Sequence, residues 1–145
     1  MMRRLLLTAF ALVPLLLSGS GCATTAKKQI DDSKLGQLAS SVGISTQTAQ
    51  GALGSMLDLT QRRVDTGQFQ QITQYIPRAQ AYIDGAQQMG AYQGGVRNAA
   101  DLQASFAKLG MSPEQSQKFV AAVTSYLEEA GGQQVSSLLS GALSN

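Results

Sequence analysis

Apolar side chains recur along most of this chain at the three- and four-residue spacing of amphipathic helices. The clearest stretch is Leu102–Gly131, where two such runs are separated by a very short corner. Gly110 suits the left-handed residue that ends a helix, and Ser112 is a good N-cap for the next one. Pro113 fits the first position of that helix, and Gln115 completes a Ser-x-x-Gln capping box. The pattern predicts two helices joined at this corner.

A second corner of the same kind lies 67 residues earlier in the chain. Gly43 and Ser45 occupy there the places of Gly110 and Ser112. Two helix–Gly-x-Ser–helix hairpins favour a duplicated or pseudo-symmetric helical domain over a solenoid, which needs about three or more repeats. Convergent capping chemistry is the alternative explanation for the match.

The rest of the chain continues the helical pattern. The predicted helices, each delimited by its apolar run, are Leu35–Val42, Ala49–Val64, Phe69–Ile76, Ala79–Ala86, Leu102–Leu109, Phe119–Leu127 and Val135–Leu143. Asp65-Thr66-Gly67 is expected to end the second of them, and Asn98 to cap the helix that contains Leu102. No stretch has the pattern of a strand. The sequence therefore predicts a small all-α domain of about six or seven helices around one core.

Two features interrupt this periodicity. Gly51 and Gly54 lie inside the second predicted helix, where a glycine costs about 1 kcal/mol relative to alanine. We expect these two glycines to let another helix approach closely. The run Gln87–Gly95 contains three glycines and no helical spacing, which predicts a loop.

Residues 1–21 have a different character. They combine a basic start at Arg3 and Arg4 with the apolar run Leu5–Leu17 and a small, polar segment before Cys22. This is the three-part layout of a secretory signal peptide. The apolar run has 13 residues, fewer than the roughly 20 that a membrane-spanning helix needs. We therefore expect a cleaved leader, with an uncleaved N-terminal anchor as the alternative.

Cys22 is the only cysteine, which excludes an internal disulfide. The segment LLLSGSGC resembles a bacterial lipobox, in which small residues precede a cysteine that receives diacylglycerol. Gly21 and Ser20 match that pattern, whereas Gly19 stands where the pattern prefers leucine. Lipidation of Cys22 is the expectation, and ordinary cleavage a few residues later, giving a soluble periplasmic protein, is the alternative. Ala23 is not the aspartate of an inner-membrane retention signal, which favours the outer membrane, facing the periplasm.

The resulting division is a leader at 1–21, a tether at 22–33 and a helical domain at 34–145. The whole chain has 11 Lys and Arg against 9 Asp and Glu. Arg3 and Arg4 leave with the leader, so the remaining chain has no net charge. Without a basic field there is no electrostatic basis for binding nucleic acid.

The composition also limits catalysis. The chain has no histidine, the commonest general base and transition-metal ligand. Glu128 and Glu129 are adjacent on a predicted helix and point in different directions, so they do not form a catalytic carboxylate pair. We assign no catalytic, cofactor-binding or metal-binding residue and expect no enzyme activity.

Three residues are candidates for contacting a partner. Arg62 and Arg63 form a local basic cluster, which suits either a solvated face or contact with a phosphate or lipid headgroup. Tyr92 lies in the glycine-rich loop, where an aromatic side chain is available to a partner.

Two segments carry a family resemblance: FQQITQYIPRAQAYIDGA at Phe69–Ala86 and the long run Leu102–Leu143. Their Phe-x-x-Ile…Ile-Pro run, Leu-Gly-Met-Ser-Pro corner and Gly-Gly…Leu-Leu-x-x-Leu ending resemble the VcgC/VcgE bacterial family of unknown function, which is distantly similar to YidB-like helical domains. The resemblance implies a helical fold and a cell-envelope setting. It implies no reaction, ligand or catalytic residue.

Together these observations predict a non-catalytic envelope lipoprotein, held to the membrane through Cys22, that acts as an interaction or accessory domain for an envelope protein. The alternative is a periplasmic carrier or sensor of an apolar small molecule held between helices near Gly51 and Gly54. A deep apolar cavity would favour the carrier, and an exposed apolar patch on a filled core would favour the interaction domain.

Overall fold

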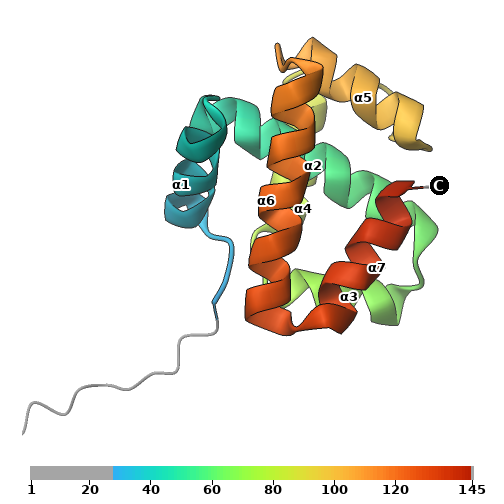
Figure 1. The fold of residues 1–145 in the computed structure, drawn as a ribbon. Helices are drawn as coiled ribbons and strands as arrows, with labels where there is room; N and C mark the ends of the chain where they lie inside the picture. Colours follow the sequence, from blue (N-terminus) through green and yellow to red (C-terminus); the bar gives the residue numbers. More distant parts are fainter. Residues whose placement is uncertain (1–27, 145) are drawn as a thin grey trace, which may run out of the picture.

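The computed structural model describes residues 28–144, and all regular structure within them is helical (Figure 1). The seven helices in this range are α1 (Asp32–Val42), α2 (Thr46–Arg63), α3 (Thr66–Thr73), α4 (Ala79–Gln88), α5 (Ala99–Lys108), α6 (Pro113–Gly131) and α7 (Gln133–Ser144). The prediction of a small all-α domain is confirmed. None of these helices is both long enough and apolar enough to cross a bilayer.

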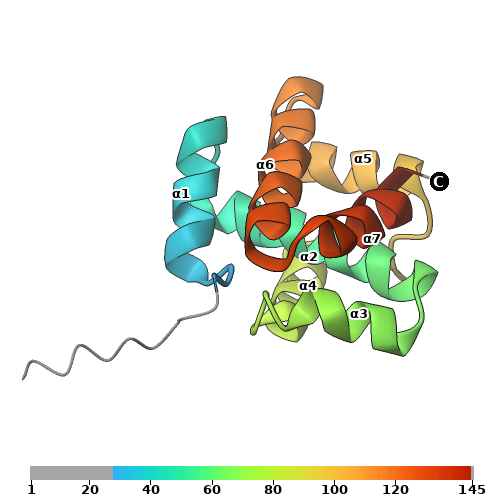
Figure 2. The same ribbon diagram turned by 60° about the horizontal axis from the view of Figure 1, so that its bottom comes forward.

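Helix α2 runs through the middle of the domain, and α1, α4, α5 and α7 pack against it (Figures 1 and 2). Every residue from Gly51 to Thr60 is buried. The buried hydroxyl groups on this helix donate to carbonyl oxygens one turn earlier, Ser55 to Gly51 at 2.9 Å and Thr60 to Met56 at 2.7 Å. These bonds let a helix that is not entirely apolar stand in the core without unsatisfied hydroxyls.

Helices α2 and α4 approach each other closely at Gly54. A Cβ atom placed on Gly54 would overlap the Tyr82 carbonyl oxygen and lie 2.8 Å from the Cβ of Ala86. At Gly51, an added Cβ would come within 2.8 Å of Leu109 and 2.9 Å of Met89. The expectation that these glycines admit a neighbouring helix is confirmed. It also means that the space beside them is filled.

The two predicted corners have matching local geometry. Gly43 and Gly110 are both left-handed, with φ of 80° and 82°. The amide after each glycine donates to a carbonyl five residues earlier, at 3.0 Å in both corners. Ser45 and Ser112 cap the following helices, and the capping box of Gln115 is present. The Gln115 side-chain nitrogen Nε2 also donates to the Gly43 carbonyl oxygen at 3.2 Å, so the two corners are in contact.

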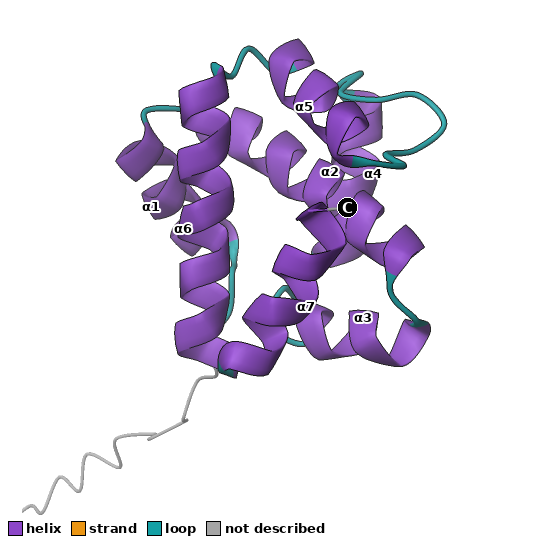
Figure 3. Cartoon of the chain, turned by 45° about the vertical axis from the view of Figure 1, so that its right-hand side comes forward, coloured by secondary structure: helices purple, strands orange, loops and turns teal. Residues whose placement is uncertain are grey.

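Some boundaries differ from the sequence-based ones. The sequence predicts that Asp65 helps to end the second helix, but in the structure it caps α3. Its side chain accepts from the Gln68 backbone amide, and the Gln68 side chain accepts from the Asp65 backbone amide. Helix α2 therefore ends at Arg63, and Thr66 opens α3. Ile76 lies beyond α3 in the turn that leads to α4 and is fully buried there. Asn98 caps α5 as predicted. The connection from α4 to α5 is the long loop beside α5 in Figure 3.

We predict that Gly54→Ala lowers the free energy of unfolding by about 1–3 kcal/mol or more, because the added methyl group meets the backbone of α4 rather than a side chain that can move. Gly85→Ala is the matched control, since Gly85 is also inside a helix and nothing lies within 4 Å of an added Cβ. It should be neutral or stabilise by up to about 1 kcal/mol through helix propensity. Urea unfolding followed by circular dichroism measures both. Equal stability of the two variants would contradict the tight contact.

Candidate functional site

The described part of the chain begins with a short segment that is packed against the domain. Ile30 is fully buried, and its amide donates to the Tyr75 carbonyl oxygen at 2.7 Å. The Gln29 side chain donates to the Gln74 carbonyl oxygen at 3.0 Å, and the Tyr126 hydroxyl donates to the Gln29 carbonyl oxygen at 3.2 Å. The domain therefore starts no later than Gln29. The predicted boundary after residue 33 placed it too late, because one buried isoleucine in a polar stretch gives no periodic signal.

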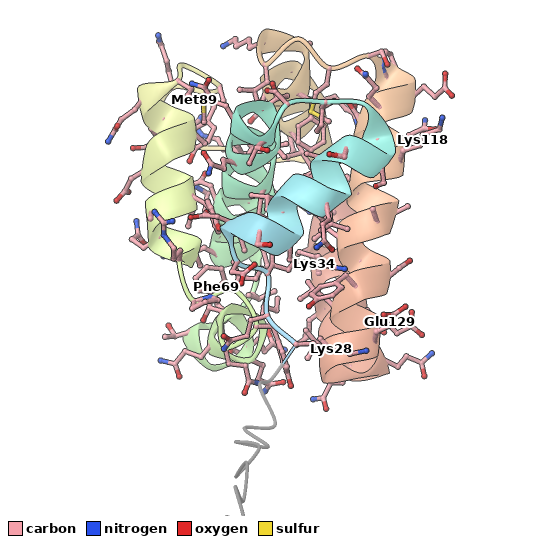
Figure 4. The ribbon with its side chains drawn as sticks, turned by 90° about the vertical axis from the view of Figure 1, so that its left-hand side faces the viewer. Lys28, Lys34, Phe69, Met89, Lys118 and Glu129 are labelled. Atoms are coloured by element: carbon pink, nitrogen blue, oxygen red, sulfur yellow. The ribbon has the colours of Figure 1, made fainter. Side chains whose placement is uncertain are left out.

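The leader (residues 1–21), the predicted lipidation site at Cys22 and the first part of the tether lie outside the described residues. What the structure adds is the place where the chain reaches the domain. Lys28 lies beside the C-terminal end of α6, with its ammonium nitrogen 4.0 Å from a Glu129 carboxylate oxygen (Figure 4). Both side chains are exposed, so this pair contributes little to stability.

The first turn of α1 is tied to α4. Asp31 is the N-cap and accepts from the Lys34 amide at 2.8 Å, as expected for an acidic helix start. Asp32 reaches across to α4, where it pairs with Arg78 and accepts from the Tyr82 hydroxyl at 2.9 Å. Burial first, and then the bond to Asp32, raises the pKa of Tyr82. Arg78 is thus engaged with the first turn of α1.

Arg62 is bound to a buried carboxylate. Its Nε donates to Asp58 Oδ2 at 2.9 Å, and the Asp58 side chain is 5% exposed. The hydrogen bond to Asp58 is the main cause of the raised pKa of Arg62. The same Asp58 oxygen accepts from the Val96 amide at 2.6 Å, which fastens the α4–α5 loop to α2. An added Cβ on Gly95, whose φ is 106°, would overlap the Arg62 guanidinium. The loop therefore crosses directly over this ion pair.

Arg63 also binds the loop. Its Nη2 donates to the Arg97 carbonyl oxygen at 3.2 Å, while its Nε is buried and has no hydrogen-bond partner. Neither Arg62 nor Arg63 is a free surface cation in the described part of the chain. Both arginines hold the α4–α5 loop. The Arg62 side chain is 45% exposed, and contact of the two arginines with a partner stays a prediction.

Tyr92 lies in the core. The residue is 5% exposed, and its hydroxyl donates to the Ile83 carbonyl oxygen at 3.2 Å. Burial, followed by the negative charge of Asp58, raises its pKa. The expectation that Tyr92 contacts a partner is not supported by this position, because the loop folds back and buries the ring. Tyr82 is also in the core, and Tyr126 is half-buried.

Asp58 is the residue that sequence reasoning missed. Its i,i+4 spacing to Arg62 was a usable signal for a side-chain pair on this helix. Its second partner, the Val96 amide, is 38 residues away and has no sequence signature.

The described surface has an apolar groove of about 490 Å³ between α5, α6 and α7. Its lining contains no charged side chain: Gln103, Gln117, Val120, Ala121, Thr124, Ser125, Ser140, Leu143 and Ser144. A smaller polar pocket of about 250 Å³ lies between the α4–α5 loop and α5, with Arg97, Asp101 and Lys108 in its wall.

Among residues 28–144 no three acidic side chains gather in a way that could hold a metal ion.

The family resemblance is confirmed by comparison with known proteins. A family model described as a protein of unknown function, VcgC/VcgE (DUF2780), matches residues 20–144. No curated protein matches the chain significantly. No solved structure does so either.

We predict that Asp58→Asn lowers the free energy of unfolding by about 1–3 kcal/mol, because the charge-assisted bonds to Arg62 and the Val96 amide are buried. Asp84→Asn is the control. Asp84 is exposed and, within residues 28–144, accepts a side-chain hydrogen bond from Gln80 alone, at 2.9 Å. Removing its charge should therefore change the free energy of unfolding by less than about 0.5 kcal/mol. Urea unfolding of the two variants tests this. A smaller effect at Asp58 than at Asp84 would be incompatible with a buried anchor.

The tyrosines predict the response to alkaline pH. The folded protein raises the pKa of Tyr82, Tyr92 and Tyr126 above the unfolded value of about 10. Above that pH the unfolded chain has lost these protons and the folded one still holds them, so stability is complete below about pH 10 and falls as pH rises further. Unfolding free energies across this range should show the decline, and Tyr92→Phe should make it shallower. An unchanged slope in that variant would contradict a raised pKa for Tyr92.

Proposed function

The chain belongs to the VcgC/VcgE family of unknown function, and from that premise we propose that it is a non-catalytic, lipid-anchored accessory domain of the cell envelope that binds an envelope protein. The lipid is carried by Cys22, in the lipobox-like segment before the tether. The bound protein is held by the groove between α5, α6 and α7.

The groove is the observation that carries this proposal. The core beneath it is filled, since Phe106, Phe119 and Leu139 are at most 1% exposed. The groove itself is open, and Val120, Ala121 and Leu143 give it an apolar floor. An apolar recess left on a filled core is typical of a protein-binding surface.

The lining of the groove indicates the chemistry of the partner. Glutamine and serine side chains from α5, α6 and α7 contribute to it, and no charged residue takes part. A partner segment that inserts a small apolar side chain and offers uncharged hydrogen-bonding groups fits this surface. Such an interface would depend little on ionic strength.

The absence of a catalytic role is supported by how the acidic residues are used. Asp58 and Asp32 serve as anchors between elements, through Arg62 and Arg78. Glu128 and Glu129 are exposed on α6. None of these carboxylates lines the groove.

A second candidate function is that of carrier or sensor of an apolar small molecule. It was placed near Gly51 and Gly54, but α4 and the side chains of Leu109 and Met89 fill that space. The groove is the alternative location, because its volume of about 490 Å³ lies within the range of small-molecule sites. Extraction of lipids and small molecules from the purified protein distinguishes the two functions.

Crosslinking in intact envelopes tests the accessory role. We predict that wild-type protein captures a specific envelope protein, and that Ala121→Arg loses this capture because the new charge enters the groove. Ala81→Arg is the matched control, since Ala81 is likewise an exposed helical alanine but lies on α4. Cys22→Ala should also lose the capture. Capture that survives Ala121→Arg would contradict the assignment of the groove.

A further inference from the structure

The place where the chain joins the domain is fixed at one end of the molecule. There the segment Lys28–Ile30 passes between the turn after α3 and the C-terminal end of α6, and it bonds to both. The end of α6 also packs on that turn, because an added Cβ on Gly131 would lie 2.7 Å from the Tyr75 ring. Gln134 at the start of α7 bonds to Gln71 of α3 at 3.4 Å. We call the surface formed by Lys28, Gln71, Gln74, Glu129, Gln133 and Gln134 the tether face.

Chain length limits how far this face can stand from a lipid on Cys22. Five residues lie between Cys22 and Lys28, so the six steps of chain from one to the other span at most about 22 Å when fully extended. Helix α6 has 19 residues and is therefore about 28 Å long. Figure 4 shows Lys28 and Glu129 at the end where the chain leaves, and Lys118 and Met89 towards the other end. A domain anchored in this way has one end that is much closer to the bilayer.

Resting on the proposed lipid anchor, we infer that the tether face lies against the lipid headgroups and that the α5–α6 corner points away from the membrane. Because Lys28–Ile30 is bound to the domain, only the residues before Lys28 can vary the distance between the domain and the lipid. A tether this short therefore also restricts the orientation of the domain. The face suits a headgroup layer because it consists mainly of uncharged amides, with Lys28 and Glu129 opposing each other in charge. Orientation therefore comes from tether geometry, not from electrostatic attraction.

This arrangement also positions the groove. Val120 lies nine residues before Glu129 on α6, or about 14 Å along the helix axis. The groove is thus raised above the headgroups and is accessible to the periplasmic part of a partner.

Fluorescence quenching in vesicles tests this orientation. The lipidated full-length protein is inserted in vesicles of phosphatidylethanolamine and phosphatidylglycerol that include nitroxide-headgroup lipids. Because a lipidated Cys22 is blocked, a single introduced cysteine carries the fluorophore, either Gln133→Cys on the tether face or Ala107→Cys near the α5–α6 corner. Both positions are exposed and helical. Gln134→Cys is the second tether-face position, in case one variant fails to fold.

We predict that labels at Gln133 and Gln134 are quenched several-fold more strongly than the label at Ala107, at low and at high salt. Inserting about 20 Gly/Ser residues after Ala26, which adds a mean span of about 25 Å, should remove most of the difference. Equal or reversed quenching in protein that floats with the vesicles would overturn the orientation and leave the anchor intact. A difference that survives the longer tether would overturn the orienting role of the short one. Protein that does not float would overturn the lipid anchor and this inference together.

Discussion

The contact between α2 and α4 at Gly54 is the constraint on which the rest of the structure depends. Because the Tyr82 backbone lies directly against Gly54, α4 sits close enough to bury one whole side of α2. The other sides are covered by α1, α5 and α7. A helix enclosed in this way can hold a buried carboxylate only if the surrounding chain supplies its partners. Arg62 and the Val96 amide do so for Asp58.

The sequence predicted best what is determined locally. The left-handed glycines at Gly43 and Gly110, and the caps at Ser45 and Ser112, depend on residues within five positions of one another, so the sequence alone is enough to predict them. The same locality explains the error at Asp65, where a turn-forming triplet suited both the end of one helix and the start of the next. A capping box decides between the two only once the helix is in place.

What the sequence could not predict depends on contacts between distant segments. Tyr92 lies in a glycine-rich stretch that has all the signs of an exposed loop, yet the Asp58–Val96 bond draws the loop inward and buries the ring. Ile30 stands alone among polar residues, and its burial follows from the position of Tyr75. Part of the candidate site was missed for the same reason, because the groove is built from helices whose side chains meet only after α7 folds back beside α6.

The docked segment at Lys28–Ile30 also determines how the domain bears mechanical load. A pull applied to the chain before Lys28 reaches the Ile30–Tyr75 hydrogen bond and the buried Ile30 side chain before it reaches α1. The force then divides between the turn after α3 and, through Tyr126, the long helix α6. Helix α1 is thereby shielded from tension, although it is the first helix within residues 28–144. Thermal fraying and forced unfolding of this domain should accordingly begin at different places.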